Sequence, residues 1–208
     1  MKIITVQLGE RSYDIKIGRN ILSSVGQELL TFNFSSTCLL VSNPLIYELY
    51  GSMVKNSLEE AGFKPSVALV EDGEQAKSLK WTAKLYDKAL QGSLNRNSPI
   101  IALGGGVVGD LAGFIAATYM RGVPFIQIPT SLLAQVDSSV GGKVAINHPK
   151  GKNLIGAFYQ PKLVLADLDT LKTLSLRELR SGLAEVIKYG VIWDKVFFEY
   201  MESHIKEA

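Results

Sequence analysis

An α/β fold, with a mainly parallel sheet flanked by helices, is predicted by three features of this sequence. Short apolar strands alternate with longer amphipathic helices, which is the pattern of βαβ units. A glycine-rich loop joins one of these strands to the helix that follows it, as in Rossmann-like domains. After Thr173 the pattern is purely helical to the end of the chain. The sequence therefore predicts a Rossmann-like sheet followed by a helical segment.

The expected elements follow one another with one long interruption. Residues 3–8 and 13–17 are strand-like segments on either side of a polar turn, and they predict a hairpin. Further strands are expected at 37–41, 66–70, 99–103, 124–128 and 163–165, and helices at 44–61, 74–91, 110–120, 131–136 and from 176 onward. Residues 137–161 break the rhythm with glycines and prolines, yet hold several apolar and aromatic side chains. We expect a long irregular connection there, with a functional role rather than disorder.

Composition excludes several classes of protein. Hydrophobic residues make up 47% of the 208 residues, which allows a sizeable core and argues against a disordered chain. The formal net charge of +2 gives no general attraction to nucleic acid or to membranes, so neither is expected as a partner. No apolar run approaches the ~20 residues of a membrane span, and the amino terminus lacks a signal-peptide pattern. The single cysteine, Cys38, fits a reducing compartment, so a cytoplasmic location is expected.

The glycine loop is the first chemical signal. Gly104, Gly106 and Gly109 form the pattern G-x-G-x-x-G between an apolar strand and a helix. Glycines there let the backbone approach a pyrophosphate, and the helix amino terminus offers free N–H groups. A dinucleotide fold normally carries an acid ~20 residues further on for the ribose, and residues 124–133 contain none. We therefore expect other residues to hold the ribose.

Long stretches of the sequence resemble the 3-dehydroquinate synthase family. The resemblance starts with Gly104-Gly105-Gly106-Val107-Val108-Gly109-Asp110 and extends through residues 104–114. It continues through residues 119–122, 129–143, 146–153, 158–161 and 181–190. It covers essentially the whole chain and is strongest from Gly73 to Gly190.

The resemblance implies a reaction and a division of the chain. Enzymes of this family belong to the shikimate pathway and are lyases that convert 3-deoxy-D-arabino-heptulosonate 7-phosphate, a sugar phosphate, into 3-dehydroquinate and phosphate. They use NAD and a divalent metal, Zn²⁺ or Co²⁺, and are often homodimers. Residues 1–174 would form the NAD-binding α/β domain. Residues 175–208 would begin a truncated helical domain that completes the metal and substrate site.

The resemblance also assigns residues to the two ligands. Arginine forks and lysine ammonium groups suit the phosphate and carboxylate of the substrate. Glu74 and Asn43 are candidates to replace the missing ribose acid. The implied cofactor contacts are Asn43, Asp72, Glu74, Lys77, Gly105, Gly106, Val107, Val108, Gly109, Asp110, Thr130, Ser131, Lys143 and Lys152. The implied substrate contacts are Arg121, Asp137, Lys143, Lys152, Asn153 and Lys188. Of these, the cations Arg121, Lys143 and Lys152 lie after strands or in the irregular segment and could converge on one cleft.

Glu185 is the metal candidate implied by the resemblance. It shares a helix face with Lys188 and Tyr189, three and four residues on. Catalytic roles are expected for Lys143, Asp137, Lys188 and Glu185. A catalytic zinc site uses about three protein ligands, and the family's other two are histidines beyond residue 208. His148 is expected to assist ligand binding or to cap a loop, and His204 to be a surface residue. We therefore expect the 208-residue chain to be inactive alone.

Three other functions stay open on the sequence alone. A related sugar phosphate cyclase would share the loop, the metal and the elimination chemistry. A metal-dependent polyol or alcohol dehydrogenase would carry a similar loop but release NADH at each turnover. A non-catalytic fragment would bind a nucleotide or a partner without chemistry.

Overall fold

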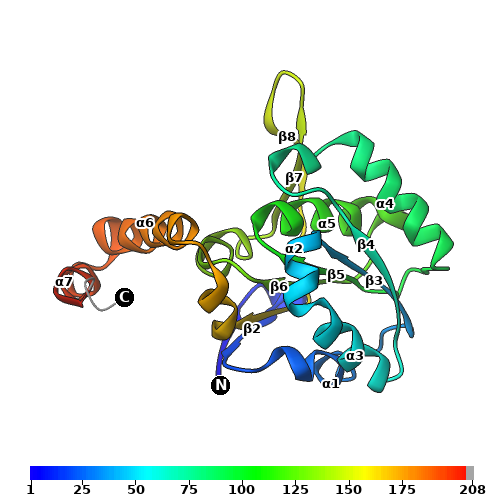
Figure 1. The fold of residues 1–208 in the computed structure, drawn as a ribbon, viewed down its shortest axis with the longest axis horizontal. Helices are drawn as coiled ribbons and strands as arrows, with labels where there is room; N and C mark the ends of the chain where they lie inside the picture. Colours follow the sequence, from blue (N-terminus) through cyan, green and yellow to red (C-terminus); the bar gives the residue numbers. More distant parts are fainter. Residues whose placement is uncertain (205–208) are drawn as a thin grey trace.

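The fold is built on one twisted sheet of seven strands (Figure 1). The computed structural model describes residues 1–204. The strand order is β1-β2-β9-β6-β5-β3-β4; β1 and β2 pair antiparallel, and the other neighbours are parallel. The strands are β1 (Lys2–Val6), β2 (Tyr13–Gly18), β3 (Thr37–Ser42), β4 (Lys64–Leu69), β5 (Ile100–Gly104), β6 (Phe125–Pro129) and β9 (Leu163–Asp167). The predicted α/β class with a mainly parallel sheet is confirmed.

Helices cover both faces of the sheet, which explains the continuous apolar runs of its central strands. Every residue of β5, β6 and β9 is buried. On one face, α4 (Leu79–Gln91) and α5 (Gly106–Thr118) pack around Leu85, Leu111 and Ile115. On the other face, α1 (Val25–Leu29) and α3 (Ser52–Glu60) pack around Leu29 and Leu58. The sheet is thus held between two apolar layers.

Residues 137–161 are more regular than the sequence suggested. They contain a β-hairpin of β7 (Lys143–His148) and β8 (Gly151–Phe158), so the expectation of a long irregular connection is wrong. Val144 and Ile146 alternate along β7 and are buried, because that face lies against α5. The close contact needs a small residue on the helix: a Cβ at Gly113 would lie 2.3 Å from Val144 Cγ1. The hairpin therefore forms a second layer over α5.

Several element boundaries also differ from the predicted ones. Helix α5 begins at Gly106 rather than at Asp110, so part of the glycine loop is the first turn of the helix. The short helix α1 was not predicted. The expected helix at 44–61 comprises α2 (Pro44–Ile46), η3 (Tyr47–Gly51) and α3, and the one at 74–91 comprises η4 (Glu74–Ala76) and α4. The remaining short helices are η1 (Gly9–Arg11), η2 (Leu22–Ser24), η5 (Tyr119–Arg121), η6 (Ala134–Ser138) and η7 (Leu168–Thr173).

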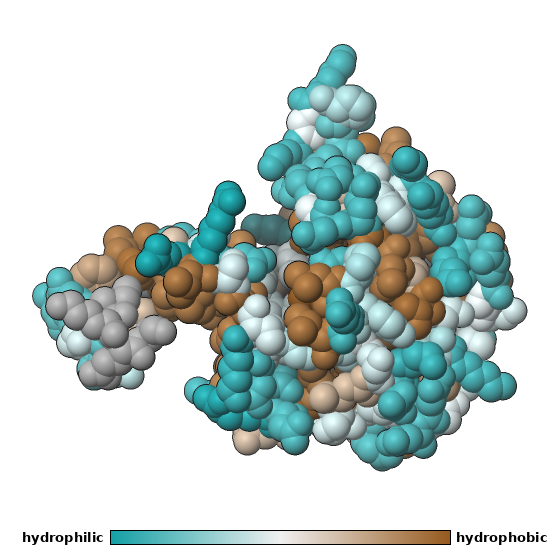
Figure 2. Space-filling view, viewed as in Figure 1, coloured by the Kyte–Doolittle hydropathy of each residue, from teal (hydrophilic) through white to brown (hydrophobic). Residues whose placement is uncertain are grey.

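Two helices at the carboxyl end form an arm that leaves the body of the domain (Figure 1). They are α6 (Leu176–Trp193) and α7 (Lys195–His204), and Ser175 caps α6 by accepting from the Glu178 N–H. Apolar side chains gather along this arm (Figure 2), with Trp193 90% and Val196 76% exposed. Within residues 1–204, no helix is long and apolar enough to cross a membrane.

Candidate functional site

A groove lies at the carboxyl ends of the central strands. The chain runs from β3 outward to β4 and then returns to β5 on the other side of β3, so the strand order reverses between β3 and β5. Ligands of open α/β sheets bind at such a switch point. The groove has a volume of about 320 Å³ and is lined by residues that follow β3, β4, β5 and β6. These include eight of the predicted cofactor contacts: Asn43, Asp72, Gly105, Gly106, Val107, Val108, Thr130 and Ser131.

The glycine loop supplies one wall of this groove. Gly105 precedes the first turn of α5, whose leading N–H groups have no partner within the helix. A Cβ at Gly106 would lie 3.0 Å from Ser138 Oγ, and one at Gly104 would lie 2.8 Å from Val108. Side chains at these two positions would therefore crowd the first turn of α5, whose free N–H groups can bind an anion. Gly109, by contrast, does not line the groove and packs toward Gln127.

An acid does reach this groove, and it comes from the segment after β4, which lies before the glycine loop in the chain. Asp72 lies beyond the end of β4, and its Oδ1 accepts from Asn43 Nδ2 at 2.8 Å. Asn43 also caps α2, since its Oδ1 accepts from Ile46 N at 2.8 Å. The pair fixes a carboxylate at the groove. Glu74, proposed from sequence for that role, lies outside the groove lining.

Part of the groove wall was not anticipated from the sequence. Leu45, Ile46 and Leu49 form an apolar side of the groove. In the sequence, these three residues are apolar positions at helical spacing just after β3. The other unpredicted lining residues are Glu71, Thr173, Leu174 and Glu178, which come from the end of β4, from η7 and from α6. No sequence pattern brings those distant segments together.

A buried ammonium group organises a second cluster next to the groove. The Lys77 side chain is only 4% exposed, and its Nζ lies 2.6 Å from Asp110 Oδ2 and 3.7 Å from Glu74 Oε1. Lys77 Nζ also donates to Asn153 Oδ1. Burial raises the pKa of the Asp110 carboxyl, and the hydrogen bond and charge of Lys77 offset part of that rise. The cluster joins α5, η4 and the hairpin through one cation.

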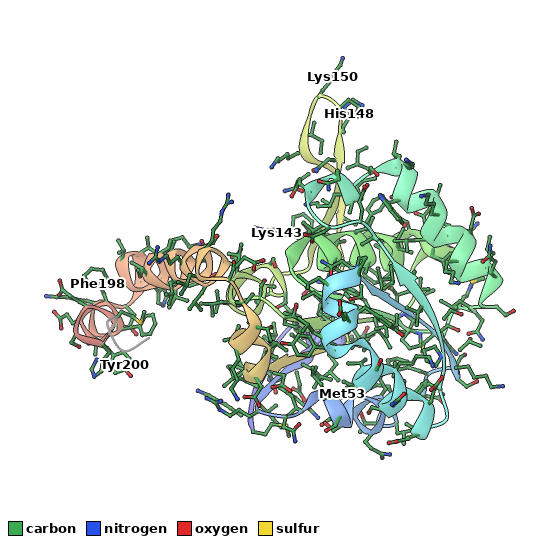
Figure 3. The ribbon with its side chains drawn as sticks, viewed as in Figure 1. Met53, Lys143, His148, Lys150, Phe198 and Tyr200 are labelled. Carbon is green, nitrogen blue, oxygen red and sulfur yellow. The ribbon has the colours of Figure 1, made fainter. Side chains whose placement is uncertain are left out.

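The β7–β8 hairpin lies over this cluster and adds a further hollow. Lys143 and Asn153 line a cavity of about 380 Å³ together with Asp110. Lys143 stands at the base of the hairpin, while His148 and Lys150 are at its tip (Figure 3). His148 Nδ1 accepts from Lys150 N at 3.1 Å, so this side chain caps the turn. Lys152 is exposed on β8 and does not line that cavity.

A third cluster forms where α6 meets η6. Tyr189 donates to Asp137 Oδ1 at 3.1 Å, and Lys188 forms an ion pair with Glu185. Burial raises the pKa of the Tyr189 hydroxyl, and its hydrogen bond to Asp137 adds to the rise. Gly182 allows the approach, since a Cβ there would lie 2.6 Å from Leu132. The side chains predicted for metal and proton chemistry thus lie on one helix face beside Asp137.

Metal ligation by this chain rests on few side chains. The Glu185 side chain is 21% exposed, and its carboxylate is of a type that can ligate a divalent ion. Among residues 1–204, no three His, Cys, Asp or Glu side chains gather closely enough to hold an ion. Within the described residues, Glu185 by itself does not form a metal site.

Arg121 is not brought to these clusters within the chain. It lies in η5, after the carboxyl end of α5 and before β6, with a positive φ of 66°. The 13-residue helix is about 20 Å long, which separates Arg121 from the glycine loop at its other end. Arg121 therefore does not line the groove, and its convergence with Lys143 and Lys152 on one cleft stays a prediction.

The comparisons with known proteins agree on one family. A model of the 3-dehydroquinate synthase N-terminal region matches residues 67–181. A curated 3-dehydroquinate synthase of Pelotomaculum thermopropionicum is 59% identical over 206 residues, covering 99% of this chain and 56% of that protein. The chain thus spans about half the length of the curated relatives that it matches.

Solved structures of two other synthases share the fold. A 2-deoxy-scyllo-inosose synthase complexed with carbaglucose-6-phosphate, NAD⁺ and Co²⁺ superimposes with a TM-score of 0.84 at 27% identity, covering 90% of this chain and 50% of that one. The 2-epi-5-epi-valiolone synthase of Streptomyces hygroscopicus with NAD⁺ and Zn²⁺ bound gives 0.84 at 30% identity, covering 96% and 55%.

Proposed function

Because the chain belongs to the 3-dehydroquinate synthase family, we propose that it forms the cofactor-binding half of that synthase. The proposed reaction converts 3-deoxy-D-arabino-heptulosonate 7-phosphate into 3-dehydroquinate with loss of phosphate, a phosphorus–oxygen lyase reaction. The observation that carries the proposal is the groove of Asp72, Gly105–Val108 and Thr130–Ser131, with the Lys77–Asp110–Asn153 cluster next to it. A cofactor cradle at the start of a helix is what redox-assisted elimination of phosphate needs from this half of the enzyme.

The groove residues would hold NAD. The α5 terminus would receive the pyrophosphate, and the Asp72 carboxylate, held by Asn43, would accept from a ribose hydroxyl. Carboxylates of Glu71 and Glu178 also line the groove, and among residues 1–204 no lysine or arginine does. When bound, the cofactor would supply a hydride acceptor that makes a neighbouring substrate proton acidic. The apolar wall of Leu45, Ile46 and Leu49 would exclude water from one side.

The cations near the groove would hold the substrate's anionic groups. Lys143 and Asn153 line one cavity, and Lys188 lies beside Glu185 on α6. Asp137 accepts from Tyr189 and is a candidate to hold a proton near the reacting carbon. Zn²⁺ or Co²⁺ bound by Glu185 and by ligands from outside this chain would polarise the reacting oxygens. The roles of Lys152 and Arg121 toward substrate stay predictions.

The same proposal covers the activity of the chain alone, its oligomeric state and its location in the cell. The 208-residue chain alone would bind NAD without completing turnover, because Glu185 would lack its partner ligands. The full-length protein would be a homodimer, and the exposed edge strand β1, with Ile3 50% and Ile4 42% exposed, is a surface suited to a second copy. The reducing compartment expected from Cys38 supports a cytoplasmic location.

Two measurements test the proposal. Calorimetry should detect NAD binding to the 208-residue chain, and a full-length protein that carries this sequence should release phosphate from the heptulosonate phosphate with no net NADH. Failure of the chain to bind NAD would contradict the cofactor assignment. Turnover of a different sugar phosphate in a substrate panel would identify another cyclase. Net NADH accumulation would identify a dehydrogenase, and full activity of the 208-residue chain would contradict its proposed incompleteness.

A further inference from the structure

The side chain of Asn147 connects the two proposed ligand sites, and nothing in its own chemistry requires it to touch either ligand. It lies in β7 opposite an irregularity of the hairpin: Ile146 pairs with Ile155 and His148 with Gly151. Three residues of β8 therefore stand opposite Asn147 alone. Extra residues of this kind re-aim side chains and are frequent next to active sites.

Asn147 makes a hydrogen bond with each part that it adjoins. Its Oδ1 accepts from Asn153 N at 2.8 Å, within the irregular part of β8, where Asn153 has a positive φ of 57°. Its Nδ2 donates to Glu74 Oε1 at 2.8 Å, and its backbone N–H donates to Lys77 O at 2.8 Å. The donor faces a carboxylate and the acceptor faces an N–H, so the amide has one consistent orientation.

These contacts fasten both ends of η4 to the hairpin. Glu74 opens that turn, and Lys77 follows it and carries the buried ammonium group that meets Asp110 and Asn153. Asp72, in the cofactor groove, precedes the same turn by two residues. Movement of the Asn147 amide would therefore displace a groove carboxylate and the Asn153 side chain together.

We propose that Asn147 is a positioning residue that sets the geometry of the Asp72–Lys77 segment and of Asn153 at once. The inference rests on the proposed function, because it treats the groove as the NAD site and the hairpin cavity as the substrate site. Asn147 acts through Glu74 on the cofactor side and through the Asn153 backbone on the substrate side.

A cycle of variants with NAD calorimetry tests the cofactor side. Asn147→Asp keeps the acceptor for Asn153 N but sets a carboxylate against that of Glu74, and we expect NAD affinity to fall about tenfold. In the double variant, Glu74→Gln with Asn147→Asp, position 74 carries the amide and position 147 carries the carboxylate, so the two side chains can again form a hydrogen bond. The double variant should bind NAD within about threefold of Glu74→Gln alone. A simple structural lesion would make the two losses add instead.

Asn95→Asp is the matched control. Asn95 Oδ1 also accepts from a backbone N–H, that of Asn97 at 2.9 Å, and from Ser35 Oγ at 2.7 Å. It precedes β5 and so lies at the opposite end of the sheet from the groove. This variant should leave NAD affinity unchanged. Equal losses in Asn147→Asp and Asn95→Asp would overturn the inference.

Hydrogen exchange gives a second readout that needs no ligand. Asn147→Asp should speed exchange in residues 74–78 about tenfold while the Asn153 amide stays protected, and Asn147→Ala should speed both. Unchanged exchange in both variants would refute the positioning role even if NAD binding is not detected. A wild-type chain that fails to bind NAD but exchanges as expected would contradict the proposed function and leave this local role supported.

Discussion

Replacing Lys77 by methionine isolates the contribution of the buried cation. The Lys77 side chain is 4% exposed and its closest carboxylate, Asp110, is 20% exposed. Removing one partner of a buried pair costs about 3–5 kcal/mol, because the other charge is left without compensation. Since water still reaches part of Asp110, we expect a loss of about 2–3 kcal/mol in the free energy of unfolding. For a chain of this size, that lowers Tm by about 5–10 °C.

The pH dependence of this loss has a definite sign. Burial already holds the pKa of Asp110 above its ordinary value, and Lys77 is the main opposing influence. Without Lys77 the folded-state pKa rises further. A carboxyl whose pKa is raised by folding favours the folded state at low pH, and that contribution is lost as pH rises through the folded-state pKa. The difference between Lys77→Met and wild type should therefore be largest at neutral pH and should shrink in acid.

Urea unfolding followed by circular dichroism from neutral to acidic pH measures both quantities. Lys55→Met is the matched control, because Lys55 pairs with Glu59 at 2.8 Å on an exposed helix face, and it should leave the midpoint unchanged. Asp110→Asn added to Lys77→Met should restore most of the stability. A Lys77→Met loss no larger than that of Lys55→Met, or one independent of pH, would refute the reasoning.

Three further changes test other parts of the fold and groove. Asp167→Asn should cost about 1–3 kcal/mol in urea unfolding, because the buried carboxylate accepts from Ile21 N at 2.7 Å and from three further backbone N–H groups. Gly113→Ala should cost about 1–3 kcal/mol by forcing Val144 away from α5, with faster hydrogen exchange in β7. Gly106→Val should lower NAD affinity more than about tenfold, because its side chain would crowd the first turn of α5, and it should also lower Tm, because its Cβ would lie 3.0 Å from Ser138 Oγ.

Each of these has an outcome that would count against it. Wild-type stability in Asp167→Asn would mean that the carboxylate is not needed to anchor residues 20–22. Exchange confined to α5 in Gly113→Ala would mean that the hairpin does not depend on close packing at that glycine. Undiminished NAD binding by Gly106→Val would mean that NAD does not bind at the glycine loop.

The central sheet could be predicted because its residues carry a dense local signal. Leu39–Val41 and Ile100–Leu103 are uninterrupted apolar runs, and such runs in a chain that alternates with helices have few arrangements other than buried parallel strands. The hairpin was missed because its signal is weaker. Val144 and Ile146 do alternate, but the glycines, the proline and the irregular pairing opposite Asn147 conceal the period of two.

The position of the groove acids depends on the order of the strands in the sheet. In the usual dinucleotide fold, the acid that binds the ribose lies downstream of the glycine loop. Here β3 and β4, the strands beside the loop on that side of the sheet, precede it in the chain, so the groove acids Glu71 and Asp72 come from upstream of the loop. Only the sheet order, which depends on contacts distant in sequence, decides between the two directions.

Arg121 lies at the opposite end of the strands from the groove. A residue between a helix and the next parallel strand lies at the amino ends of the strands, whereas the groove is at their carboxyl ends. Arg121 precedes β6, so chain direction alone places it away from the groove. Among residues 1–204, Lys77 is occupied by Asp110 and Asn153, whereas Lys143 on the hairpin and Lys188 on the arm are more exposed. We therefore propose that the phosphate of the substrate would depend on Lys143 and Lys188, because a cation already paired with a carboxylate has less charge to offer an anion.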